Sequence, residues 1–146
     1  MKFKNHKNNG TNMFIVDKSP LCRKAIKRLL ENQLQVNIIG DDTYNDGLRQ
    51  MSFIPNADVI LMDVQTTNLL SIYKAKDWLK LFPKTKIIAL TLFYDSVLLK
   101  VLEEVGFKGC ILRSELSKDI TPALECVLSG GQYFDSLKTI KNYRYE

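Results

Sequence analysis

The chain has 146 residues, of which 45% are hydrophobic and 25% charged, and its formal net charge is +5. This length suits one domain with a single core, and the apolar runs are far shorter than the roughly 20 residues of a membrane span. The basic start of the chain lacks the apolar stretch of a secretory signal, so we expect a cytoplasmic protein without membrane contact. The surplus charge lies before Met13 and after Leu137, which argues against direct nucleic-acid binding by this chain.

The two ends are expected to differ from the body of the chain. We predict a disordered basic tail over residues 1–12, one domain over 13–134, and a C-terminal tail or the start of a linker over 135–146. The only histidine, His6, lies in the first of these, so His-based catalysis is not available. The three cysteines lack metal-ligand spacing and are expected to be reduced thiols that act as small apolar side chains: Cys22, Cys110 and Cys126.

Strand-like and helix-like segments alternate along the chain, which predicts a parallel α/β fold. The expected strands are 13–17, 35–40, 57–63, 86–91 and 108–113. A first helix is expected from Pro20, and further helices over 44–54, 69–82, 95–105 and 116–129. The first helix carries an apolar stripe (Leu21, Ala25, Ile26, Leu29, Leu30) and a basic face expected to be solvated (Arg23, Lys24, Lys27, Arg28). In the last helix, an apolar stripe suits either the core, which we expect, or a dimer face: Ile120, Ala123, Leu124 and Val127.

Four expected strands end on a residue that can take part in chemistry: Asp17, Asp63, Thr91 and Arg113. The run that ends at Asp63 is apolar until that carboxylate, as in a strand buried on both faces of a sheet. The carboxyl ends of parallel strands share one edge, where open α/β folds place their sites. Two acidic strand ends would build an anionic pocket for a divalent cation or a phosphoryl group. The plainer alternatives are turn formers or helix caps for the two Asp residues, a β-former for Thr91 and a surface residue for Arg113.

This order of elements resembles the receiver domain of bacterial two-component response regulators over about residues 13–134. The Leu61-Met62-Asp63 segment looks like the phosphoacceptor strand of that family, and Ile88-Ala89-Leu90-Thr91 like the strand that ends in its switch hydroxyl. Three segments are similar to the NarL/FixJ subfamily, whose members usually carry a DNA-binding domain after the receiver: Pro20-Leu21, 106–109 and 130–134. The resemblance implies a flavodoxin-like (βα)5 three-layer sandwich with a parallel sheet of order 2-1-3-4-5.

The resemblance also implies roles for the strand ends. Asp63 would accept a phosphoryl group from a histidine kinase, and Thr91 would bond a phosphoryl oxygen. Asp17 and Asp63 would hold Mg²⁺, with the backbone carbonyl of Gln65 as a further ligand. The chain would not be an enzyme beyond self-phosphorylation and autodephosphorylation at Asp63. The expected partners are a histidine kinase or another signalling protein, and a second copy of the chain.

Several departures from the family pattern bear on the pocket. Lys18 stands where the family has a second acidic metal ligand, Arg113 replaces the lysine at the end of the fifth strand, and Cys110 replaces an aromatic switch residue. The loop 64–68 lacks the Met-Pro and Gly that the family shows. If the Lys18 ammonium points inward, the charges of Asp17, Asp63, Lys18 and Arg113 cancel without a metal, and Mg²⁺ is repelled.

We therefore predict an atypical receiver that acts as a signalling or interaction module, with Asp63 at the phosphoacceptor position and with Mg²⁺ binding weak or absent. The alternative is a functional phospho-accepting receiver of a NarL/FixJ-type transcriptional regulator whose DNA-binding domain is absent from this chain. A third class, a flavodoxin-like enzyme that binds flavin or a nucleotide, is disfavoured because residues 17–21 offer no glycine for a phosphate loop.

Overall fold

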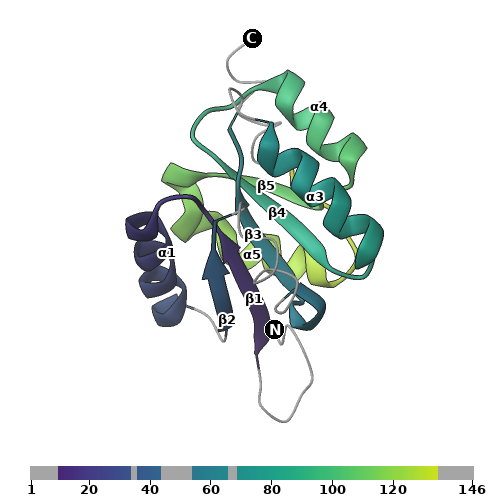
Figure 1. The fold of residues 1–146 in the computed structure, drawn as a ribbon. Coiled ribbons are helices and arrows are strands. Elements are labelled where there is room, and N and C mark those ends of the chain that lie inside the picture. Colours follow the sequence, from purple (N-terminus) through teal and green to yellow (C-terminus); the bar gives the residue numbers. More distant parts are fainter. Residues whose placement is uncertain (1–9, 34–35, 44–53, 66–68, 135–146) are drawn as a thin grey trace.

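The computed structural model describes residues 10–33, 36–43, 54–65 and 69–134 of the chain. Its strands form one parallel sheet in the order β2-β1-β3-β4-β5, which confirms the predicted fold class and topology (Figure 1). The strands are β1 Thr11–Val16, β2 Val36–Asp42, β3 Val59–Asp63, β4 Lys86–Thr91 and β5 Gly109–Leu112. The helices are α1 Pro20–Gln33, α3 Leu70–Leu81, α4 Ser96–Val105 and α5 Leu116–Leu128, with short 3₁₀ turns at η1 Ile54–Asn56 and η2 Arg113–Glu115.

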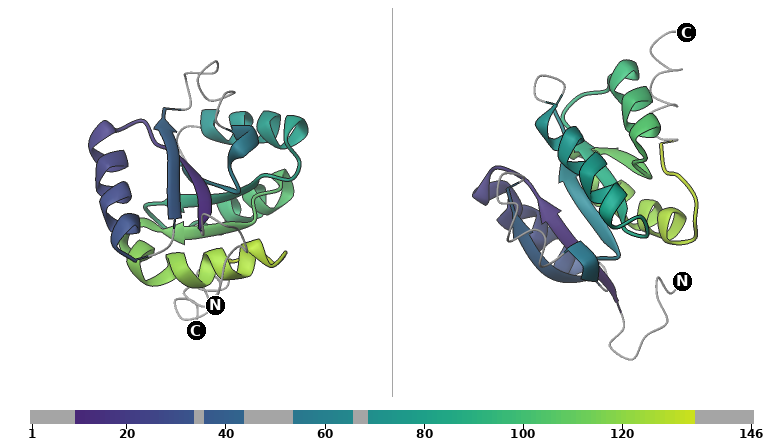
Figure 2. Two further views of the ribbon diagram at one scale, coloured as in Figure 1. Left: turned by 90° about the horizontal axis from the view of Figure 1, so that it is seen from below. Right: turned by 45° about the vertical axis from the view of Figure 1, so that its right-hand side comes forward.

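Helices cover both faces of the sheet. The α1 and α5 helices lie on one face, and α3 and α4 lie on the other (Figures 1 and 2). Side chains alternate along each strand, so Leu61 of β3 packs with the α1–α5 layer and Met62 packs with the α3–α4 layer. All five residues of β3 are buried, as its continuous apolar run predicts.

Local sequence signals account for the ends of the helices. The Ser19 hydroxyl accepts a hydrogen bond from the Cys22 N–H at 3.2 Å, and Pro20 occupies the first helical position of α1. The Asp95 side chain caps α4 by accepting from the N–H groups of Val97 and Leu98. Gly106 ends α4 with a φ of 116°, a left-handed conformation that glycine adopts without steric cost.

Most predicted elements are confirmed with small shifts of their ends. The first strand begins at Thr11, two residues before its predicted start, because Thr11 and Asn12 pair with β2. The apolar stripe of α5 is fully buried in the core, as expected. Residues 44–53 of the predicted helix at 44–54 lie outside the described residues. Its last residue, Ile54, begins the 3₁₀ turn η1. Among the described residues, no helix is long and apolar enough to cross a membrane.

The predicted apolar stripe of α1 is confirmed for Ile26, Leu29 and Leu30 and is wrong for Leu21 and Ala25. Leu21 is 77% exposed and Ala25 is also exposed, whereas Ile26 and Leu30 are buried against the sheet. The buried face of α1 is therefore rotated by about one residue from the predicted stripe. This rotation brings part of the basic face toward the end of the sheet.

Candidate functional site at the carboxyl edge of the sheet

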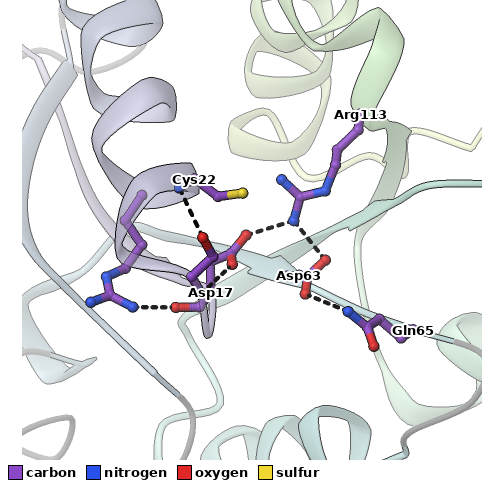
Figure 3. Close-up of polar contacts among 7 residues, drawn as sticks. Asp17, Cys22, Asp63, Gln65 and Arg113 are labelled. Atoms are coloured by element: carbon purple, nitrogen blue, oxygen red, sulfur yellow. Dashed lines mark hydrogen bonds and ion pairs between the residues drawn. The ribbon is translucent and has the colours of Figure 1, made fainter.

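One guanidinium nitrogen bridges the two predicted carboxylates. Asp17 follows β1, Asp63 ends β3, and Arg113 follows β5, so the sheet brings all three to its carboxyl edge. The Nη2 atom of Arg113 donates to Asp17 Oδ2 at 2.5 Å and to Asp63 Oδ1 at 2.7 Å (Figure 3). The side chains of Asp17 and Asp63 are 3% and 5% exposed, and that of Arg113 is 22% exposed. The contacts are charge-assisted hydrogen bonds between side chains that are mostly buried.

The environment of Arg113 favours its charged form. Burial alone would lower the pKa of the guanidinium, but the hydrogen bonds and negative charges of Asp17 and Asp63 outweigh it and raise that pKa. Arg113 is thus a permanent cation between two carboxylates, and the surface-residue interpretation does not describe it.

Asp17 is a turn former as well as a pocket residue. Its Oδ1 atom accepts a hydrogen bond from the Ser19 N–H at 2.9 Å, which closes an Asx turn immediately before α1. Its other carboxylate oxygen accepts from Arg113. The turn-former interpretation of Asp17 is therefore confirmed for one oxygen, while the other oxygen contacts Arg113.

Lys18 lies in the middle of this turn with its side chain exposed. In the part of the chain that the structure describes, Lys18 forms no ion pair. The neutral pocket of four residues, which required the Lys18 ammonium to point inward, is therefore not formed in this structure. Two carboxylates and one guanidinium remain, with a net charge of −1.

The remaining predicted residues flank the pocket. The side-chain amide of Gln65 donates to Asp63 Oδ2 at 3.4 Å, whereas its predicted role concerned the backbone carbonyl (Figure 3). The Thr91 hydroxyl is buried and donates to the Phe93 carbonyl at 3.0 Å. Next to it, Cys110 is fully buried, and burial raises its pKa to about 12 although a hydrogen bond with Thr91 acts against the shift. The Cys110 thiol is therefore not an ionisable group at neutral pH.

A second ion-pair cluster beside the pocket escaped the sequence analysis. The Nε atom of Arg23 lies 3.0 Å from Asp41 Oδ1, and the Nζ atom of Lys27 lies 2.7 Å from Asp41 Oδ2. Arg23 Nη1 also donates to the backbone carbonyl of Asp17 at 2.5 Å. The side chains of Arg23, Asp41 and Lys27 are 15%, 23% and 36% exposed, so the expectation of a solvated face is wrong for Arg23.

The charge state of Asp41 follows from this cluster. Burial would raise the pKa of its carboxyl, but the hydrogen bonds and charges of Lys27 and Arg23 outweigh burial and lower that pKa. The spacing of four residues between Arg23 and Lys27 places them on one side of α1. This spacing, together with an Asp near the end of the neighbouring strand, is the feature of the sequence that could have predicted the ion-pair cluster.

Comparisons with known proteins agree with the fold. No family model matches the chain. The transcriptional regulatory protein DegU of Brevibacillus brevis is 24% identical over 139 residues, which cover 93% of this chain and 59% of DegU. The oxygen regulatory protein NreC of Staphylococcus aureus is 30% identical over 129 residues, which cover 83% of this chain and 56% of NreC. The chain thus spans less than two thirds of the length of these relatives.

Solved structures show the same fold. The isolated REC domain of RcsB from Salmonella enterica serovar Typhimurium, in the presence of the phosphomimetic BeF3⁻, superposes with a TM-score of 0.72 at 23% identity, covering 90% of this chain and 98% of that one. A LuxR-family two-component response regulator from Aurantimonas sp. SI85-9A1 gives a TM-score of 0.78 at 19% identity, covering 94% of this chain and all of that one. With the topology and the acidic strand ends, these matches show that the chain has the fold of response regulator receiver domains, and its sequence relatives are regulatory proteins of that kind.

Proposed function

We propose that this receiver is an atypical one, which acts as a signalling or interaction module, with Asp63 at the phosphoacceptor position and with weakened Mg²⁺ binding. The observation that carries the proposal is the bridge from Arg113 Nη2 to both Asp17 and Asp63. A cation that belongs to the chain already lies where the two carboxylates converge.

The residues of the pocket fit a magnesium ion poorly. Receiver domains generally bind Mg²⁺ at the phosphorylation site, and this ion requires near-octahedral oxygen ligands at about 2.0–2.1 Å. Among the described residues, no group of three or more His, Cys, Asp or Glu side chains could hold a metal ion. To use both carboxylates, the ion would have to displace the Arg113 guanidinium from between them.

The charge of the pocket supports weakened rather than abolished binding. The family pattern combines three carboxylates with one lysine, which gives a net charge of −2 before the metal enters. The pocket in this structure carries −1, because Lys18 replaces one carboxylate and points to solvent. The attraction for a divalent cation is accordingly about half as large at equal distance and dielectric constant.

The alternative function is that of a working phosphoacceptor in a NarL/FixJ-type transcriptional regulator. In that case an oxygen of Asp63 attacks the phosphorus of a phosphohistidine, the new P–O bond forms as the P–N bond breaks, and the imidazole leaves with the electron pair. Arg113 favours this reading in one respect, since a guanidinium has several N–H donors that suit phosphoryl oxygens. Thr91 would then exchange its contact with Phe93 for one with the phosphoryl group.

The partners that we propose follow from the receiver fold. They are a histidine kinase or another signalling protein, and a second copy of the chain. A solved structure with the same fold contains two RcsB dimers bound to two parallel DNAs. DNA binding of this kind is proposed only for a whole regulator and not for this receiver alone.

A titration of Mg²⁺ with and without beryllofluoride, followed by the amide NMR signals around Asp63, tests the proposal. We expect little response of the wild type at millimolar Mg²⁺. We expect the double variant K18D/R113K to bind at least about tenfold more tightly, which corresponds to about 1.4 kcal/mol. The control is K24D/R113K, which makes the same charge change at Lys24, an exposed residue of α1. Tight, saturable Mg²⁺ binding by the wild type that is lost in D63A would contradict the proposal and support the alternative.

A further inference from the structure

We propose that Arg23 is a positioning residue of the pocket, which holds Asp17 toward Arg113 and Asp63 and is itself held by Asp41. The inference deepens the proposed function, since it concerns the support of the same pocket. It rests on contacts that the bridge of Arg113 does not involve.

The guanidinium of Arg23 joins two elements at once. Its Nε atom pairs with Asp41 Oδ1 at the end of β2, and its Nη1 atom donates to the carbonyl of Asp17 after β1. A planar guanidinium presents its donors in a fixed fork, so the first contact sets the direction of the second. The position of the Asp17 backbone is therefore tied to the position of Asp41.

Asp17 is held at each of its oxygen atoms. The carbonyl accepts from Arg23, Oδ1 accepts from the Ser19 N–H, and Oδ2 accepts from Arg113. Because the carbonyl and Oδ1 are fixed from the side of the loop, the direction in which Oδ2 points is also restricted. Arg23 thus acts on the pocket through Asp17 and does not touch Asp63.

Lys27 provides the contrast that makes the inference specific. It pairs with the same carboxylate as Arg23, through Asp41 Oδ2 at 2.7 Å. Among the described residues it forms no hydrogen bond with Asp17. Replacing Lys27 removes a cation from the cluster while leaving the contact with the Asp17 carbonyl in place.

The contacts form one continuous network of alternating charge along the carboxyl edge of the sheet. It runs from α1 and β2, through the residue after β1, to the ends of β5 and β3. Its members are Lys27, Asp41, Arg23, Asp17, Arg113 and Asp63. The pocket is therefore supported from the sheet edge opposite to Arg113, and a change at β2 is expected to reach it.

Side-chain ¹⁵N NMR of the full chain in Mg²⁺-free buffer tests the inference. A guanidinium held by two carboxylates rotates slowly and gives resolved Nη signals, which for Arg113 are assigned by their loss in R113K. We expect these signals to be resolved in the wild type and in K27M and to be averaged in R23M. We expect R23K to behave as R23M, because one ammonium can pair with Asp41 but lacks the fork that also reaches Asp17.

Resolved Arg113 signals in R23K and R23M, equal to those of the wild type, would overturn the positioning role. If R23M does not fold, R23K decides the question, since it keeps the charge. Loss of the signals in K27M as well would show that the charge of the cluster matters and not the contact of Arg23 with Asp17, which also overturns the inference. Because the NMR sample contains no Mg²⁺, its result does not depend on whether the proposal of weakened Mg²⁺ binding is correct.

Discussion

Two ion-pair clusters lie side by side at the carboxyl edge of the sheet, and they are built with opposite imbalance. The inner cluster (Asp17, Arg113, Asp63) has two carboxylates for one cation, and its acidic side chains are buried. The outer cluster (Arg23, Asp41, Lys27) has two cations for one carboxylate, and it is partly open to solvent. The inner cluster thus carries a net charge of −1, and the outer cluster next to it carries a net charge of +1.

The difference in burial between the two clusters predicts which of them contributes more to the stability of the fold. Removing one partner of a buried ion pair leaves an uncompensated charge, whereas an exposed pair contributes little. The inner cluster should therefore dominate stability, and the outer cluster should act mainly through geometry.

The largest effect is expected from R113M. It leaves Asp17 and Asp63 buried side by side without a cation, which should lower the free energy of unfolding by about 3 kcal/mol. Urea denaturation at neutral pH measures this loss. Millimolar Mg²⁺ should restore part of it in R113M while leaving the wild type unchanged, since only the variant offers both carboxylates to the ion. Unchanged stability of R113M would mean that the bridge does not offset the repulsion between the two carboxylates.

The residues of the inner cluster were predicted from the sequence, and those of the outer cluster were missed. Asp17, Asp63 and Arg113 each end a strand in the sequence, and parallel topology alone brings such ends together. The direction of Lys18 could not be read in the same way, because it depends on the Asx turn that Asp17 forms with Ser19.

The phase of α1 explains why Arg23 was missed. The stripe that includes Leu21 and Ala25 suggested a buried face that would leave Arg23 in solvent. The sheet buries the side of that stripe that carries Ile26 and Leu30, and Arg23 lies three residues before Ile26 on the same side of the helix. On a helix a shift of one residue turns the face by about 100°. The spacing of the apolar residues in α1 did not fix the direction of its buried face to within such a shift.

A smaller, pH-dependent effect is expected from D41N. At neutral pH the variant should be about 1 kcal/mol less stable than the wild type, because a partly buried carboxylate loses its pairing with Arg23 and Lys27. The folded pKa of Asp41 lies below its unfolded value, so this contribution is present above the unfolded pKa and is lost as pH falls through the folded one. Urea denaturation of both proteins from pH 7 downward should show their difference shrink. A difference that stays constant in acid would assign the loss to packing and not to charge.

The smallest loss of stability is expected from K118M, which serves as the exposed-pair control for R113M. Lys118 lies 3.4 Å from Glu115 in an exposed pair of i,i+3 spacing, close in sequence to Arg113. The variant makes the same charge change as R113M, yet an exposed pair of this kind should contribute only about 0.3 kcal/mol. Salt should remove even that, since solvent screens exposed charges more strongly than buried ones. If K118M lost as much free energy of unfolding as R113M, the cause in both variants would be the removal of a positive charge near the start of α5. A clear gap between the two variants would instead assign that loss to the two buried carboxylates that share Arg113.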